Sequence, residues 1–290
     1  MSDDEKVATF PEPFQPDFDD LSSASSEHPF MGASVELLKE AGHLTILAGG
    51  ALPAEHDRDE AILCGLVIRI SKLSVALVAE TCELRGEQQL TLTRQILEFL
   101  STLNYLLEES SIDAFDAYVK DSLVAEREFL RAVQRAADQR GEEWPIETRM
   151  MESIHRTATA ANIADVEAIP GRGAIGWPSI EIRLARLGAQ TYGAYRMGSH
   201  AIHGTWSDLY FNHLQLREDG TFDPDGGHST PRPQPLTMST LLITWIVEKY
   251  VARRGGVVGE EIIPRLRDLK DRVLRLDILH ERFVQARKGQ

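Results

Sequence analysis

The side chains best suited to chemistry lie close together between Arg196 and His203. If this stretch is helical, Arg196 and His203 are two turns apart and project within about 20° of each other. Ser199 and His200 flank them, at about 60° on one side and about 40° on the other. A cation, a hydroxyl and two imidazoles on one helical stripe are costly to bury without partners. This stripe is therefore the first candidate for a functional site.

Phosphate chemistry is one use for such a stripe, because an arginine can hold a phosphate and a histidine can move a proton between about pH 6 and 8. This pair is sufficient in principle for metal-independent RNA cleavage, in which the substrate's own 2′-hydroxyl attacks. Arg196 and His203 are the expected catalytic pair, with His200 beside them. His228, in a Gly/Pro-rich loop, is a candidate second imidazole that only the fold can place.

Metal binding is the second reading of the same histidines, since His200 and His203 at positions i and i+3 can share a metal ion. An HExxH pattern is absent, however, and the nearest downstream acid is Asp208. We therefore expect no metal and no cofactor.

A second cluster lies in a leucine-rich stretch, where Arg94 and Glu98 stand at i and i+4. An exposed pair of this kind contributes only a few tenths of a kcal/mol. Because the flanking residues are so apolar, we expect one or both charges to point inward, where they need partners. The helix carrying Tyr195 and Ser199 can supply them. A structural polar cluster, a functional site and a surface pair all remain open.

The elements that must position these residues are helices, because apolar residues recur at helical spacing along most of the chain. Helices are expected over residues 33–48, 57–83, 87–109, 112–139, 145–162, 191–203, 237–253 and 259–287, with a further helical stretch opening at Trp177-Pro178-Ser179. Asp219-Gly220 marks the turn of a small hairpin. The sequence predicts an all-α bundle of six to eight helices with a β-hairpin insertion near 213–223.

Composition narrows the classes of partner. The chain has 290 residues, 42% of them apolar and 26% charged, with a net charge of −14. Much of this charge lies in the first 28 residues, where Lys6 is the only lysine or arginine. Affinity for phosphates comes mainly from Lys and Arg, so a non-specific nucleic-acid binder is not expected, although a local RNA pocket is compatible. We expect an acidic disordered tail over 1–30, suited to a protein partner, and a single helical domain over 31–290.

The cysteines and the most apolar helix bear on location. Cys64 and Cys82 lie 18 positions apart in one expected helix, which separates them by roughly 27 Å, far beyond disulfide reach. Free thiols and the lack of a signal peptide predict a cytoplasmic protein. The apolar run over 61–78 is interrupted by Arg69 and Lys72, so it is interpreted as a core helix and no membrane partner is expected.

Two resemblances follow from these motifs. The stretches RQILEFLSTLNYLLE and YRMGSHAIHGTW resemble a helical bacterial domain family of unknown function, in which an Arg-x-x-x-Glu helix precedes a Tyr-x-x-x-Ser-x-x-x-His helix. This resemblance covers roughly residues 57–253. The interval from Arg196 to His203 is also similar to the Arg-x4–6-His signature of the HEPN superfamily of helical dimeric RNases. HEPN domains usually place a polar residue after the arginine, and this chain departs from that pattern at Met197.

The HEPN resemblance implies a metal-independent RNase, or a toxin-type or phage-defence effector, that acts as a homodimer. Arg196 would then contact the scissile phosphate and His203 would be the acid/base. The expected positioning residues are Arg94, Glu98, Tyr195 and Ser199. The alternative is a non-catalytic helical binding module, in which the same cluster is a recognition pocket or a structural network.

Overall fold

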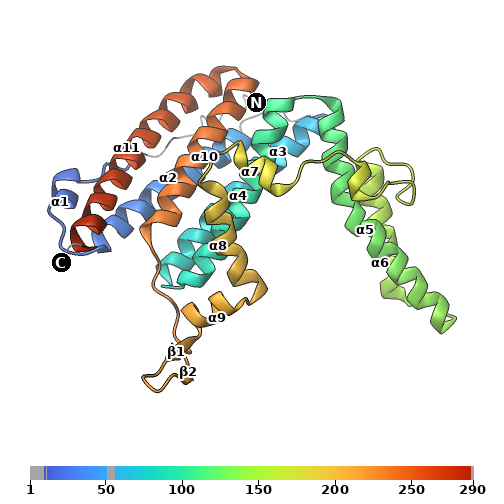
Figure 1. The fold of residues 1–290 in the computed structure, drawn as a ribbon. Helices are drawn as coiled ribbons and strands as arrows, with labels where there is room; N and C mark the ends of the chain where they lie inside the picture. Colours follow the sequence, from blue (N-terminus) through green and yellow to red (C-terminus); the bar gives the residue numbers. More distant parts are fainter. Residues whose placement is uncertain (1–9, 11, 51–55, 289–290) are drawn as a thin grey trace, which may run out of the picture. The chain divides into compact units, whose positions relative to one another are not determined.

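The computed structural model describes residues 10, 12–50 and 56–288, and these are predominantly helical (Figure 1). Within them the helices are α1 (Phe18–Ser22), α2 (His28–Gly50), α3 (Arg58–Cys82), α4 (Gly86–Glu109), α5 (Ile112–Arg140), α6 (Pro145–Ala160), the 3-10 helix η1 (Arg172–Ala174), α7 (Ile180–Ala185), α8 (Thr191–His203), α9 (Trp206–Asn212), α10 (Pro233–Arg254) and α11 (Val257–Lys288). The two strands are β1 (Leu214–Leu216) and β2 (Phe222–Pro224). The predicted all-α class with a small hairpin is confirmed.

More helices occur in this described part of the chain than the six to eight expected. The additional ones are short, because α1, α7 and α9 contain only five, six and seven residues. Two turns or fewer are too short for an apolar repeat to stand out from its surroundings. The apolar repeat therefore gives no indication of α1 or α9, whereas the helical stretch expected from Trp177-Pro178-Ser179 corresponds to α7.

Contacts between Cα atoms group the chain into two compact units. The larger unit takes the described residues of 1–55, 61–107 and 180–290, and the smaller takes 56–60 and 108–179. The expectation of one helical domain over 31–290 stays a prediction.

The larger unit has its core where α2, α10 and α11 pack on one another, with α3 and α4 completing the apolar interior. Ser71 of α3 donates to the Gly42 carbonyl of α2 at 2.9 Å, and Lys249 of α10 donates to Asn104 of α4 at 2.8 Å. The fully buried side chains at the centre are Leu37, Leu38, Ile70, Leu77, Leu97, Leu100, Leu103, Ile243, Val247, Tyr250, Leu266 and Leu269. This core fixes α4 and α10, the two long helices nearest the candidate site.

The smaller unit is built on α5 and α6, which pack against each other. Ser111 caps the start of α5 by accepting from the Ala114 N–H, and Gly141 ends it in the left-handed conformation. The segment after α6 folds back onto α5, where the Arg127 guanidinium donates to the Ile169 carbonyl. None of the expected site residues lies in this unit.

The hairpin forms where the sequence predicted it. Its antiparallel register pairs Leu214 with Pro224 and Leu216 with Phe222. Gly220 adopts a φ of 83°, which a residue without a Cβ reaches at no steric cost. The Asp219 carboxylate accepts the Thr221 N–H at 2.9 Å and steadies the turn.

The described part of the acidic N-terminal segment contacts the last helix. Asp17 caps α1, and the Arg275 guanidinium of α11 lies 3.9 Å from the centre of the Phe18 ring. The backbone of Phe14 bonds to Glu40 and Arg272. Residues 1–9 and 11, which the sequence places in a disordered tail, lie outside the described residues.

One of the described helices, α3, is long and apolar enough to cross a membrane, judged by length and composition alone. In its most apolar window 44% of the residues are buried, and its buried side includes Leu63, Val67, Ile70 and Leu77. Core helices of soluble proteins pass the same test. Cys64 and Cys82 are both free thiols in this helix.

Candidate functional site

Close packing between α4 and α8 positions the residues expected to form the site (Figure 1). A Cβ added to Gly198 would lie 2.5 Å from the Leu90 carbonyl oxygen and 2.6 Å from Arg94 Cβ. Only glycine allows two helix backbones to approach this closely. Gly204, which follows His203 directly, ends α8 in the left-handed conformation.

Arg94 is the centre of a polar cluster between these helices. Its Nε donates to Ser199 Oγ at 2.9 Å and its Nη2 donates to Tyr195 Oη at 3.0 Å. The same guanidinium lies 3.9 Å from the Glu98 carboxylate and 4.7 Å from the centre of the Tyr195 ring. The Arg94 side chain is only 17% exposed. The structure thus brings together all four residues expected to position the site.

The expected catalytic residues lie on a different face of α8. Arg196 and His203 are both exposed, about 100° around the helix from the buried Tyr195 stripe. Arg196 hydrogen-bonds to the Tyr192 hydroxyl, which itself donates to Glu181 at 2.5 Å; this bond to Glu181 is the main reason why the pKa of Tyr192 is raised. His200 Nδ1 lies 3.0 Å from Thr205 Oγ1.

The Arg94 cluster makes no direct contact with this exposed stripe. Within the described residues, no hydrogen bond or ion pair joins Arg196 or His203 to Arg94, Glu98 or Ser199. The two groups are linked indirectly, because the Tyr195 ring stacks on the Tyr192 ring with centroids 6.4 Å apart and Tyr192 bonds to Arg196.

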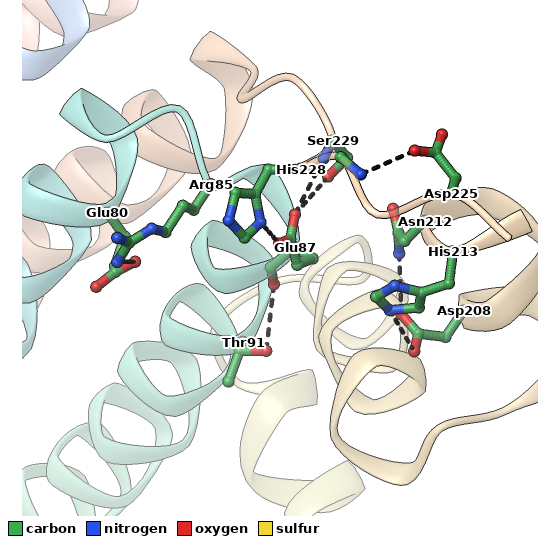
Figure 2. A network of polar contacts seen from close by, with 11 residues as sticks. Glu80, Arg85, Glu87, Thr91, Asp208, Asn212, His213, Asp225, His228 and Ser229 are labelled. Carbon is green, nitrogen blue, oxygen red and sulfur yellow. Dashed lines mark hydrogen bonds and ion pairs between the residues drawn. The ribbon is translucent and has the colours of Figure 1, made fainter.

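His228 lies on the strap, the segment of residues 225–232 that connects the hairpin to α10 (Figure 2). Its Nδ1 pairs with Glu87 Oε1, and Glu87 Oε2 accepts from both the N–H and the hydroxyl of Ser229 at 3.1 Å. Burial opposes ionisation of Glu87, but the hydrogen bonds from its own N–H, His228 and Ser229 outweigh burial and lower its pKa. Since the Ser229 hydroxyl donates to Glu87 rather than to the imidazole, Ser229 and His228 do not form a Ser–His nucleophile–base pair.

Further bonds tie the strap to its surroundings. The Gly86 N–H donates to the Ser229 carbonyl at 2.8 Å, and the Gln89 side chain bonds to both the N–H and the carbonyl of Arg232, at 3.0 and 2.9 Å. At the other end, the Asp225 N–H donates to the His213 carbonyl at 2.8 Å. The strap is therefore held against the first turns of α4.

Figure 2 also shows the carboxylate of Asp208, which lies in α9, the helix that precedes the hairpin. Asp208 of α9 is 6% exposed and accepts from Asn212 Nδ2 at 2.9 Å, and His213 Nε2 lies 3.7 Å away. Asp208 is the nearest acid downstream of the α8 histidines. In the structure its polar partners are Asn212, His213 and the Thr205 cap.

A cavity of about 1190 Å³ opens beneath the strap, entirely within the larger unit. One face each of α4, α8 and α10 forms its walls, together with the loop before α8, the end of α9, the strap and one residue of α11. The lining residues are Gly86, Gln89, Leu90, Thr93, Leu187, Gly188, Ala189, Gln190, Thr191, Ala194, Met197, Phe211, Asn212, Ser229, Thr230, Arg232, Gln234, Pro235, Thr237, Met238, Leu241, Leu242 and Asp277.

Thr93 and Asp277 are polar residues of the lining that retain unused hydrogen-bonding capacity. Thr93 is 3% exposed, and its Oγ1 has no hydrogen-bond partner among the described residues. Asp277 accepts from the Thr237 hydroxyl at 3.0 Å. Most other polar side chains of the lining, such as Gln89 and Thr191, already make hydrogen bonds within the protein.

Sequence reasoning missed this cavity. Its only signal on α4 is a stripe of small and polar residues, Gly86, Gln89 and Thr93, at helical spacing in a leucine-rich helix. Such residues are also typical of an ordinary solvated face. The spacing between helices creates the cavity, and that spacing is a property of the tertiary fold.

Fold and site together define an all-α protein with a small β-hairpin and a helix-walled cavity. The chain belongs to a family of unknown function, DUF5677, whose sequence profile matches residues 60–222, more than half of the chain. This confirms the expected membership of a helical family of unknown function. No curated protein and no solved structure matches the chain. The match includes the α4 and α8 walls of the cavity, whereas α10 lies beyond it.

Proposed function

We propose that this protein is a binding module that holds a small, mainly apolar molecule in the cavity between α4, α8 and α10. The observation that carries the proposal is the cavity itself, whose volume of about 1190 Å³ is somewhat larger than the usual small-molecule site. Its walls combine many apolar side chains with a few polar ones, as such sites do.

The Arg94 cluster has a structural role in this proposal. Its guanidinium is already bonded to Ser199 and Tyr195 and faces Glu98, which leaves it poorly placed to capture a phosphate. These contacts hold α8 on α4 and thereby fix one wall of the cavity. A recognition role for Arg94 would require it to give up these partners, with the loss of their hydrogen bonds.

The test uses the neutral fluorescent probe N-phenyl-1-naphthylamine, whose emission rises in apolar surroundings. We expect the wild-type protein to bind it saturably and Ala194→Trp, which fills part of the cavity, to weaken binding at least tenfold. Ala132→Trp, on the exposed side of α5, is the matched control and should bind like wild type. Equal binding by both variants would place the probe elsewhere and refute the proposal.

Metal-independent RNA cleavage is a second candidate function, favoured by one observation. Arg196 and His203 lie exposed on the same stripe of α8, so a substrate phosphate could reach both. Such an activity would make the protein a HEPN-like ribonuclease of the toxin or phage-defence type. Its expected homodimeric state and cytoplasmic location stay predictions.

This candidate predicts cleavage of RNA in the presence of EDTA, with products that end in a cyclic phosphate. His203→Ala should slow cleavage by about 10²–10⁴-fold, the usual contribution of a general acid or base. His155→Ala, an exposed histidine on α6, serves as the control. Unchanged RNA, or equal cleavage by the His203 variant, would rule out RNA cleavage through His203.

A further inference from the structure

We infer that the molecule held in the cavity carries a protonated amine and that Asp277 of α11 binds it. This inference rests on the binding function proposed above and adds the chemical class of the ligand. The inference follows from the two charged residues of the lining, from the ion pair that one of them already makes, and from the apolar residues around them.

Arg232 and Asp277 are the charged members of the cavity lining. Arg232 is compensated outside the cavity, since its Nη1 lies 2.8 Å from Glu27 Oε2 and its side chain is 62% exposed. Glu27 also lies 3.1 Å from His280 Nε2. The positive charge of Arg232 is therefore already paired with Glu27, outside the cavity.

Asp277 has no such compensation. Its one hydrogen bond in the described structure comes from the Thr237 hydroxyl, and no described lysine, arginine or histidine lies within ion-pair distance of it. A half-buried carboxylate beside an apolar cavity favours a cation that can replace the water it has lost. The local charge thus selects against an anionic ligand.

The rest of the lining specifies the body of the ligand. Aliphatic surface comes from four leucines, Leu90, Leu187, Leu241 and Leu242. Met238 and Phe211 add further apolar contacts. An alkyl or aromatic amine matches this distribution, with its ammonium on Asp277 and its carbon body along the helices. The unpartnered Thr93 hydroxyl offers a hydrogen bond to a second polar group of the same molecule.

The experiment compares decylamine, decan-1-ol and decanoate as competitors of N-phenyl-1-naphthylamine, all below their aggregation limits. The three share a ten-carbon chain and differ in the charge of the head group. We expect decylamine to displace the probe at concentrations at least tenfold lower than decan-1-ol, with decanoate the weakest. Calorimetric titration of decylamine provides an independent measure of the same affinity.

Asp277→Asn tests the assigned residue, because its amide oxygen can still accept from Thr237 while the charge is lost. This variant should melt like wild type, yet lose the tenfold preference for decylamine over decan-1-ol. Glu281→Gln, an exposed acid on the same helix, makes the same change in net charge and should keep the preference.

The outcomes distinguish the proposed binding function from the proposed recognition of an amine by Asp277. If the probe binds in the cavity but the three competitors are equal, or if Asp277→Asn keeps the preference, the amine assignment is wrong and the binding function stands. If the wild-type protein binds no probe, or Ala194→Trp does not weaken its binding, both are overturned.

Discussion

Arg94 and Arg196 lie in opposite environments on two helices that touch. Arg94 is mostly buried, with hydrogen bonds to Ser199 and Tyr195, whereas Arg196 is exposed. We expect Arg94→Met to lower the free energy of unfolding by about 2–3 kcal/mol, because the half-buried Ser199 hydroxyl and the buried Tyr195 hydroxyl lose their charged partner. Arg196→Met should change it by less than about 0.5 kcal/mol, as exposed substitutions usually do.

Urea denaturation monitored by circular dichroism measures both arginine variants. Equal stability of the two would show that the cluster contributes nothing to the fold, and the structural interpretation of Arg94 would fail.

Glu87 gives the protein a specific dependence on acid. Because its pKa is lowered on folding, its carboxylate stabilises the protein above the ordinary pKa of 4.5, and this contribution is lost as the pH falls through the folded value. We expect Glu87→Gln to be less stable than wild type at pH 7, and the difference to shrink below about pH 4.

Unfolding in urea at pH 7 and at pH 3.5 tests this linkage, with Glu281→Gln as an exposed control. A difference that stays constant between the two pH values would contradict a linkage through Glu87.

At the level of the helices, the close contact of α8 with α4 depends on Gly198, which has no side chain. Gly198→Ala would place a Cβ within 2.6 Å of both Leu90 O and Arg94 Cβ and force the helices apart, at a cost of about 1–3 kcal/mol. Gly193→Ala, on the open side of the same helix, has no atom within 4 Å of the added Cβ. It should stabilise the protein by roughly 0.5–1 kcal/mol through helix propensity.

Thermal melts of the two glycine variants should shift in opposite directions. A Gly198 variant as stable as the Gly193 variant would show that the helix contact tolerates a side chain.

The sequence predicted the long helices because each carries a sustained apolar repeat. The boundaries of α8 agree with the expected 191–203, since Gly204 marks its end. The helix expected over 33–48 begins earlier, at His28, where Pro29 starts the first turn. The sequence also linked Arg94 with Tyr195 and Ser199, because buried charges need partners. It could not reveal Thr93 or Asp277 as neighbours of one cavity, since they lie on helices far apart in the chain.

On the scale of the whole molecule, an ion pair connects the N-terminal segment, α2 and α11. Arg272 donates to both oxygens of Glu40 at 2.7 and 2.8 Å, and Glu40 also accepts the Phe14 N–H at 3.1 Å. Burial disfavours the charged guanidinium, but its bonds to Glu40 and Asp268 outweigh burial and raise the pKa of Arg272. The two paired side chains are only 6% and 8% exposed.

We expect Arg272→Met to destabilise the protein by about 3–5 kcal/mol, because Glu40 would remain buried without its counter-charge. The double variant Arg272→Met/Glu40→Leu should recover much of this loss. A double-mutant cycle in urea measures the coupling, and strictly additive effects would argue against a buried pair.

The helices that wall the cavity are far apart along the chain, and this has a consequence for synthesis on the ribosome. The lining begins at Gly86 and is complete only at Asp277, so the apolar faces of α4 and α8 emerge well before α10 and α11 can cover them. At typical translation rates, synthesis from Gly86 to Asp277 takes roughly 10–40 s. The nascent chain therefore exposes apolar helix faces for many seconds. We expect chaperones that hold unfolded chains to bind these faces during that time.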